Sequence, residues 1–267
     1  MEHCYRHGDR ETGVSCSNCG RPICTDCMTT TRVGMRCPEC ASERTPVRTM
    51  GSLTRDPTLT YVLIGVNVLL FLGGSLSGGL GGSGGILFSE GALSRATVAS
   101  GELWRLLTSG FLHGGLFHLF TNMFGLYILG GMLEPAIGRL RFALVYFVAL
   151  LAGSFGALLL QPSGYTVGAS GAIFGLMAAA VVIMRARGIN PMESGLGVWL
   201  GLNLLITFLV PGISIGGHLG GLVGGGLAAA LLFELGKGRR LPALVPAALV
   251  VAIGVLAITG SIFISAS

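Results

Sequence analysis

Long apolar stretches joined by short polar connections dominate the chain from residue 57 onward. Most of them approach the length of about 20 residues that a helix needs to cross a bilayer, and the fourth and fifth are shorter. The seven stretches cover residues 59–76, 106–131, 140–160, 169–184, 195–210, 213–233 and 242–263. This pattern predicts an all-α polytopic membrane protein in which every span is a helix.

The composition changes sharply near residue 56. The whole chain of 267 residues is 51% hydrophobic and 11% charged, has a mean hydropathy of +0.75 and contains 45 glycines, which are common in transmembrane helices. The first 56 residues nevertheless hold 8 of the 17 Lys and Arg, 7 of the 12 Asp and Glu and all seven cysteines. We therefore predict a zinc-binding domain (1–42), a linker (43–56), a six-helix core (57–235) and a seventh helix (236–267).

Beyond residues 1–42, which we call the head, most basic residues fall in alternate connections, and the opposite connections hold only Arg95 and Arg105. Those in the alternate connections precede the first stretch and separate the second from the third, the fourth from the fifth and the sixth from the seventh; these residues are Arg139, Arg141, Arg185, Arg187, Lys237, Arg239 and Arg240. By the positive-inside rule, the N-terminus is cytoplasmic and the C-terminus lies outside a cell membrane. No secretory signal is visible at the N-terminus. Orientation accounts for the net charge of +5, so no nucleic-acid partner is expected.

The head contains four pairs of ligand residues, each with two residues between its members. The pairs are Cys4 and His7, Cys16 and Cys19, Cys24 and Cys27, and Cys37 and Cys40. Eight ligands make two closed tetrahedral sites, which predicts two structural Zn²⁺ ions. Because about 40 residues bury too little apolar surface to fold alone, metal binding would supply the folding energy.

Two alternatives for the metal sites of the head stay open, and its partner is a separate question. A disulfide framework is one, although an odd number of cysteines in a reducing compartment argues against it. His3 is a second candidate for the eighth ligand, but the Cys4–His7 spacing matches the other pairs better. The head could also recruit a cytosolic protein partner, whose nature the spacing does not reveal.

Catalytic-type residues lie inside the apolar region. Ser170 sits between glycines at the start of the fourth stretch, and a serine needs a base to become a nucleophile. Beyond residue 56, the histidines are His113, His118 and His218. Ionisable groups at membrane depth are costly and indicate function. We interpret Ser170 and His218 as the catalytic pair of an intramembrane serine protease.

His118 and Asn122 are four residues apart, so they share one helical face. In the predicted topology they lie at a depth similar to that of Ser170 and His218. Such donors stabilise the oxyanion of acyl transfer, and the backbone N–H of Ser170 would be a third donor. The alternative is that the two side chains only bond between helices.

Small residues accompany both members of the pair. Gly221 and Gly225 share the helical face of His218, while Gly171 and Gly175 follow Ser170. This spacing lets two helices approach closely, which a serine and an imidazole from different helices require. For any one of these glycines, packing alone is an adequate explanation.

The predicted chemistry needs no cofactor. No Asp or Glu lies near the depth of Ser170 and His218, because Glu134, Glu193 and Glu234 map to the cytoplasmic side, which leaves a Ser-His dyad. Water must still reach the site, so we expect a polar cavity open to the outside. The long connection 77–105 is expected to be either disordered or functional, and its apolar residues favour partial immersion in the outer leaflet.

Together these motifs resemble the rhomboid intramembrane serine proteases. The resemblance covers residues 57–235 and rests on Trp104-Arg105, His113 with His118 and Asn122, Glu134 with Gly138, Gly168-Ala169-Ser170-Gly171, and His218 with Gly221 and Gly225. It implies a six-helix core, extended here by a seventh helix and the zinc head. The head resembles a B-box-like zinc finger, which implies that pairs one and three share one metal and pairs two and four the other.

The resemblance also implies the role of each residue. Ser170 would be the nucleophile, His218 the general base, and His118 and Asn122 the oxyanion-hole residues, with His113, Gly168 and Gly171 in support. The substrate would be a single-span membrane protein cut in or beside its transmembrane segment.

Two other functions remain. A non-catalytic membrane adaptor would bind client helices and recruit a partner through the head, but such relatives typically lack the serine or the histidine. A metal transporter would need several intramembrane carboxylates or paired histidines along a path, and the sequence places none of these in the middle of the membrane.

Overall fold

The computed structural model describes residues 2–31, 34–42, 56–78, 85–235, 242 and 244–266. The chain divides into two compact units, Met1–Thr54 and Arg55–Ser267. The predicted linker, apart from Asp56, and the basic residues Lys237, Arg239 and Arg240 lie outside the described residues.

The small unit is held by very little regular structure. Strands β1 (Glu2–His3) and β2 (Glu11–Thr12) pair antiparallel, as do β3 (Thr29–Thr31) and β4 (Gly34–Arg36). Two short helices, η1 (Thr25–Cys27) and α1 (Pro38–Ser42), complete it. Its buried cluster consists of six cysteines and Ile23, so apolar burial alone cannot hold it together.

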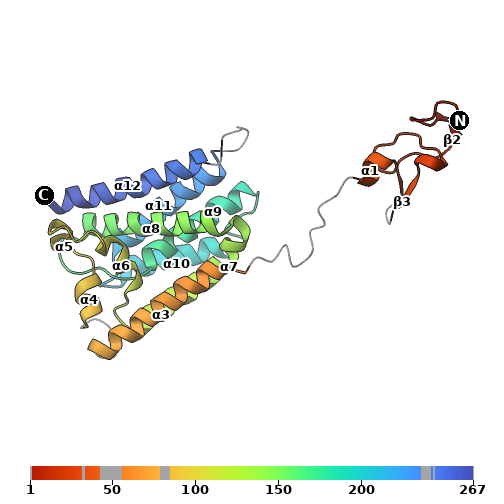
Figure 1. The fold of residues 1–267 in the computed structure, drawn as a ribbon. Helices are drawn as coiled ribbons and strands as arrows, with labels where there is room; N and C mark the ends of the chain where they lie inside the picture. The colour runs from red at the N-terminus through yellow and green to blue at the C-terminus, as the bar shows by residue number, and fades with distance from the viewer. Residues whose placement is uncertain are drawn as a thin grey trace. The chain divides into compact units, whose positions relative to one another are not determined.

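The large unit is helical throughout its described spans, which confirms the predicted fold class. Its long helices are α3 (Thr58–Gly78), α7 (Leu116–Ile137), α8 (Arg139–Leu160), α9 (Ser170–Ala186), α10 (Leu196–Leu209), α11 (Ile215–Phe233) and α12 (Leu244–Ala266) (Figure 1). Five of these are long and apolar enough to span a membrane, while α9 and α10 are shorter, as the apolar pattern predicted. The chain is a multi-pass membrane protein.

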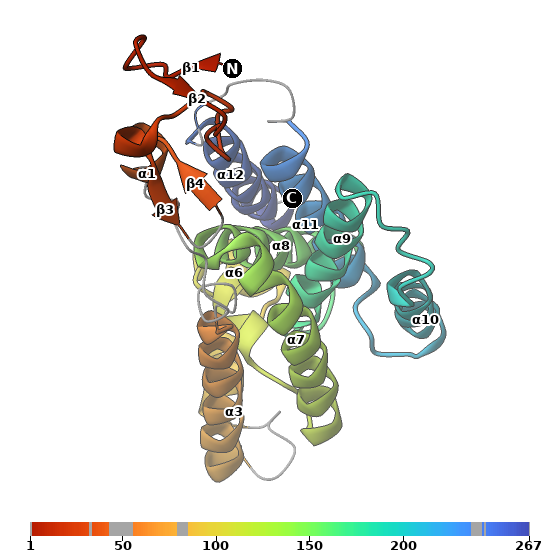
Figure 2. The same cartoon turned by 90° about the vertical axis from the view of Figure 1, so that its right-hand side faces the viewer.

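Helix α8 forms the centre of the packing. It lies against α9, α11 and α12, while α3 packs beside α7, and α10 lies at the edge next to α9 and α11 (Figure 2). Gly138 alone separates α7 from α8 and has a φ of 86°. Since L side chains rarely adopt that conformation, glycine allows the two helices to reverse direction within one residue.

The predicted second stretch, 106–131, was wrong as a single helix. The chain instead forms α6 (Arg105–Thr108), η2 (Ser109–Phe111) and an extended segment before α7 begins at Leu116. Neighbours satisfy the freed carbonyls, because Ser154 Oγ donates to Leu106 O over 2.8 Å. Helix α7 then continues beyond the predicted end, with Pro135 in its last turn.

The connection 77–105 is largely folded over the part that the structure describes. Helices α4 (Ile86–Gly91) and α5 (Arg95–Ala99) lie with α6 at one end of the bundle, which is also the end of the C-terminus (Figure 1). The Arg105 guanidinium, 4% exposed, donates to Ser89 O at 2.6 Å and Ala92 O at 3.0 Å. The buried Arg105 side chain therefore holds the connection against α6 at this end of the bundle.

Candidate active site and metal centres

Ser170 is the first residue of α9 and follows a glycine in a restricted conformation. Gly168 has a φ of +124°, and its N–H donates to Ser109 O over 2.9 Å. A residue with a side chain would be strained there. The turn thus places the Ser170 hydroxyl beside the first backbone N–H groups of α9, which have no hydrogen-bond partner within the helix.

The ring of His118 reaches this turn from α7. A Cβ on Gly168 would lie 2.6 Å from His118 Nε2 and 3.7 Å from Ser170 Oγ. Both groups therefore border one small space that only glycine leaves open. His113, which is buried just before α7, touches the His118 ring edge-on with centroids 4.9 Å apart.

His218 occupies the first turns of α11 and is 8% exposed. Its ring stacks on Phe174 with centroids 4.1 Å apart and an interplanar angle of 21°. Because Phe174 is one turn after Ser170 on α9, the imidazole lies over the face of α9 that carries the serine. Its Nδ1 lies 2.7 Å from Thr207 Oγ1 of α10.

Glycines bring α9 and α11 into backbone contact beneath these residues. A Cβ on Gly171 would meet Gly217 O at 3.1 Å, and one on Gly175 would meet Gly221 O at 2.8 Å. Gly221 and Gly225 in turn approach the backbones of Gly171 and Gly175. The close approach of α9 and α11 expected from the glycine spacing is therefore observed. That this approach serves catalysis remains a prediction.

The site is only partly assembled. Among the described hydrogen bonds, none joins Ser170 Oγ to His218, and Asn122 Nδ2 donates to His118 O over 2.8 Å within its own helix. Asn122 keeps a second amide hydrogen for another acceptor. Catalytic hydrogen bonds are often long before substrate binds, so this geometry is compatible with a dyad.

Phe174 and Thr207 were not among the predicted site residues. Phe174 could have been found from its position one turn beyond Ser170. Thr207 lies four residues after Asn203 in an otherwise apolar stretch, and polar groups at membrane depth deserve a functional interpretation.

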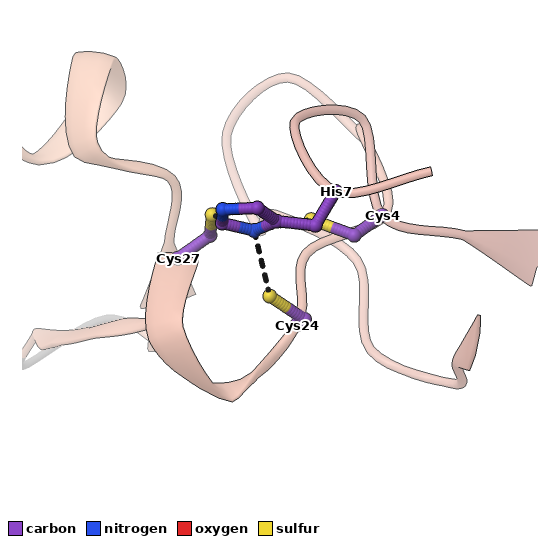
Figure 3. Close-up of side chains that lie close together, drawn as sticks. All are labelled: Cys4, His7, Cys24 and Cys27. Carbon is purple, nitrogen blue, oxygen red and sulfur yellow. Dashed lines mark hydrogen bonds between the residues drawn. The ribbon is translucent and has the colours of Figure 1, made fainter. Parts of the chain in front are cut away.

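The first candidate metal-binding group lies in the small unit and comprises Cys4, His7, Cys24 and Cys27 (Figure 3). His7 Nδ1 lies 3.3 Å from Cys24 Sγ, 3.4 Å from Cys27 Sγ and 3.9 Å from Cys4 Sγ. Ligands 2.0–2.3 Å from a tetrahedral zinc are separated by about 3.6 Å in a nitrogen–sulfur pair. The residues present therefore fit a zinc ion, with His7 rather than His3 facing the thiols.

The second group comprises Cys16, Cys19, Cys37 and Cys40. Cys19 Sγ and Cys37 Sγ are 3.8 Å apart, close to the roughly 3.8 Å edge of a tetrahedral zinc–thiolate site. The structure thus brings together pairs one and three in one group, and pairs two and four in the other. Both groups could hold a metal ion.

Hydrogen bonds in these groups favour thiolate ligands. Backbone N–H groups of Cys19 and Cys37 lower the pKa of Cys16 to about 6, more than burial raises it. Burial and neighbouring cysteines raise the pKa of Cys27 to about 11. One group cannot hold several thiolates without compensation, and a divalent cation would supply the missing positive charge.

Comparison with known proteins identifies the family of the large unit. The Rhomboid domain family matches residues 100–235, which include Ser170, His118, Asn122 and His218. The chain belongs to the rhomboid family. The matched residues contain the helices from α6 to α11, and α3 and α12 lie outside the match.

Relatives of this rhomboid include proteins named as proteases and one named as inactive. It is 36% identical over 179 residues to Rhomboid protease GluP of Bacillus subtilis (strain 168), which covers 66% of this chain and 35% of that protein. It is 36% identical over 154 residues to RHOMBOID-like protein 6, mitochondrial, of Arabidopsis thaliana, covering 55% of this chain and 49% of the relative. Inactive RHOMBOID-like protein 8 of Arabidopsis thaliana is 35% identical over 150 residues, covering 54% and 42% respectively. The chain thus spans a third to a half of the length of these relatives.

Proposed function

We propose that this rhomboid is an intramembrane serine endopeptidase with Ser170 as nucleophile and His218 as general base. The observation that carries the proposal is the stacking of His218 on Phe174, one helical turn beyond Ser170, at 4.1 Å between ring centroids. The glycine contacts between α9 and α11 support it, because they remove the side chains that would keep the serine and imidazole apart.

The reaction follows from the two groups. Ser170 Oγ attacks the carbonyl carbon of the peptide bond while His218 Nε2 takes the hydroxyl proton. His218 then gives that proton to the leaving amine, and the carbon–nitrogen bond breaks to leave an acyl-enzyme. Water, deprotonated by His218, then attacks the ester carbonyl. His218 returns that proton to Ser170 Oγ as the ester carbon–oxygen bond breaks, which releases the acid and the free serine.

The oxyanion of each tetrahedral intermediate would be held beside the Gly168 turn. His118 Nε2 borders this turn, and the backbone N–H of Ser170 lies at the helix start. Asn122 would contribute its second amide hydrogen. Losing one such donor typically lowers the rate by about 10²–10³. Dyad chemistry of this kind requires no cofactor.

The proposed substrate is a single-span membrane protein, cut in or beside its transmembrane segment. Several relatives are named as proteases or rhomboid-like proteins, and the site helices of this chain are apolar and suited to a bilayer. A site at the N-terminal ends of α7, α9 and α11 would face a segment entering from the same side.

We also propose that the N-terminus is cytoplasmic and the C-terminus is outside a cell membrane. Arg139 and Arg187 lie at the end opposite the site, where Arg139 bonds Thr58 Oγ1 at 2.6 Å and Arg187 reaches Ala136 O at 3.4 Å. At the site end, Arg95 and Arg105 are engaged with backbone carbonyls. The positive-inside rule then assigns the site to the outer side.

For the small unit we propose a B-box-like domain with two structural Zn²⁺ ions and the role of recruiting a cytosolic protein. The two four-ligand groups support the metal assignment. Both groups use four protein ligands, which is typical of a structural rather than a catalytic zinc.

A second function is a non-catalytic adaptor that binds client helices. The similarity to Inactive RHOMBOID-like protein 8 favours weighing it. The presence of both Ser170 and His218 favours the protease.

Labelling by a fluorophosphonate tests the proposed nucleophile. We expect the purified wild-type protein to react at Ser170, Ser170→Ala to lose the label, and His218→Ala to lose most of it, because the hydroxyl then lacks its base. Ser154→Ala is the control, since Ser154 is a serine of the same bundle that is buried and donates to Leu106 O. Labelling that survives Ser170→Ala, or an unreactive wild type, would favour the adaptor.

A further inference from the structure

The hydroxyl of Thr207 makes two short contacts, one within α10 and one with α11. Its Oγ1 lies 2.7 Å from Asn203 O, one turn earlier in α10, and 2.7 Å from His218 Nδ1 of α11. Thr207 is 1% exposed and His218 is 8% exposed. The contacts therefore lie where an unsatisfied polar group would be costly.

Counting hydrogens assigns the direction of both bonds. A threonine hydroxyl has one hydrogen and two acceptor lone pairs, and a backbone carbonyl can only accept. The hydrogen must therefore point to Asn203 O, since two bare oxygens 2.7 Å apart would repel. The contact with His218 is then a bond in which Nδ1–H donates to Oγ1.

We infer that Thr207 is a positioning residue that holds His218 as the Nδ1–H tautomer. A neutral imidazole with its hydrogen on Nδ1 has its free lone pair on Nε2, the form that can accept the serine proton. This inference rests on the proposed function for its consequence, but the tautomer itself is a property of the ring.

Two further contacts make the arrangement specific. Phe174 fixes the plane of the imidazole by stacking, so the bond to Thr207 fixes the remaining rotation of the ring. The hydroxyl also comes from a helix with little other buried surface, because α10 buries just Leu196 and Thr207. The orientation of the base therefore depends on α10, which carries neither member of the proposed dyad.

The positions of the protons during the reaction determine what Thr207 can do for His218. When His218 Nε2 receives the serine proton, Nδ1–H continues to donate to Thr207, whose own hydrogen stays on Asn203 O. Thr207 neither gains nor loses a proton and carries no charge. It can thus orient the imidazole as the aspartate of a Ser-His-Asp triad does, but it cannot stabilise the imidazolium by opposite charge.

Kinetics of two substitutions test the role. Thr207→Val keeps the shape and removes the acceptor, so we expect kcat for a membrane substrate to fall about 10- to 100-fold with KM within about twofold. Thr207→Ser keeps the hydroxyl and should stay within about threefold of wild type in kcat. Thr259→Val is the matched control, because Thr259 bonds its own helix through Leu256 O, at an exposed position of α12.

Nitrogen-15 NMR of histidine-labelled protein tests the tautomer without any activity. The His218 signals, assigned by their loss in His218→Ala, should show a protonated Nδ1 and an unprotonated Nε2 in the neutral ring. Unrestrained neutral histidine favours hydrogen on Nε2, so Thr207→Val should shift the population that way. The same spectra can be recorded in Ser170→Ala, so a failure of the proposed protease function leaves this result readable.

The outcomes separate cleanly. A wild-type His218 with its hydrogen on Nε2 overturns the inference even if Thr207→Val does not fold. Unchanged tautomer and kcat in folded Thr207→Val overturn it as well. An Nδ1–H signal that Thr207→Val alters, in a protein that cleaves no substrate, supports the positioning role and counts against the protease.

Discussion

At the scale of residues, single polar groups in apolar helices make up the candidate active site. Ser170, His118 and His218 could be selected from the sequence because ionisable or nucleophilic groups at membrane depth are rare and costly. Thr207 and Phe174 could not be selected in the same way. A threonine that bonds its own helix is common, and only the packing of α10 on α11 shows that its oxygen meets an imidazole.

Substitution of single histidines tests whether His7 or His3 is the eighth metal ligand. We expect two zinc ions per wild-type chain and one in His7→Ala, because His7 Nδ1 faces the thiols of Cys4, Cys24 and Cys27. His3→Ala is the control and should keep both, since His3 is exposed in β1. Zinc content of the full-length protein, measured by mass spectrometry against protein concentration, distinguishes the two. Loss of one zinc in His3→Ala but not in His7→Ala would contradict the assignment.

Acid should release this zinc from the wild type. Backbone hydrogen bonds offset the effect of burial and lower the pKa of Cys4 to about 6. A lowered thiol pKa contributes stability at high pH that is lost as pH falls toward the folded value. Zinc occupancy followed with a colorimetric chelator should therefore be full at neutral pH and be lost in acid, below the thiol pKa of about 6, because bound zinc competes with protons for the thiolates. Occupancy that does not depend on pH would contradict the thiolate account.

At the scale of elements, the number and order of long helices followed from apolar runs, but the start of α7 did not. Residues 106–115 directly precede the apolar run of α7 in the sequence, yet they form short helices and an extended segment. Gly110 packs onto Leu150 there, with a Cβ on Gly110 falling 2.5 Å from Leu150 Cδ1. The apolar run predicted one continuous helix because a run of apolar residues indicates burial but does not show which neighbour provides it.

Backbone contact between α9 and α11 predicts a sharp difference between adjacent glycines. Gly225→Ala should lower the free energy of unfolding by about 1–3 kcal/mol, because its Cβ would meet the Gly175 backbone, which cannot rotate away. Gly226→Ala should be neutral or slightly stabilising, since its Cβ would make an ordinary 3.5 Å contact with Ala178 Cβ. Unfolding of the purified variants in detergent measures both, and equal effects would contradict the packing.

At the scale of the whole molecule, the chain joins a rhomboid bundle to a small cysteine-rich unit. The change in composition near residue 56 was sufficient to expect two parts, since cysteine pairs and apolar runs follow different physical rules. How the small unit serves the membrane unit does not follow from either fold. The family and the bundle follow from the described residues, whereas activity depends on whether Ser170 and His218 act together.

Cleavage of a model single-span protein in proteoliposomes tests that central claim most directly. The account predicts that wild type cuts the substrate in or beside its transmembrane segment. Ser170→Ala and His218→Ala should each reduce cleavage by several orders of magnitude while leaving the protein folded. Full cleavage by either variant, or none by folded wild type across several substrates, would contradict the Ser170–His218 dyad.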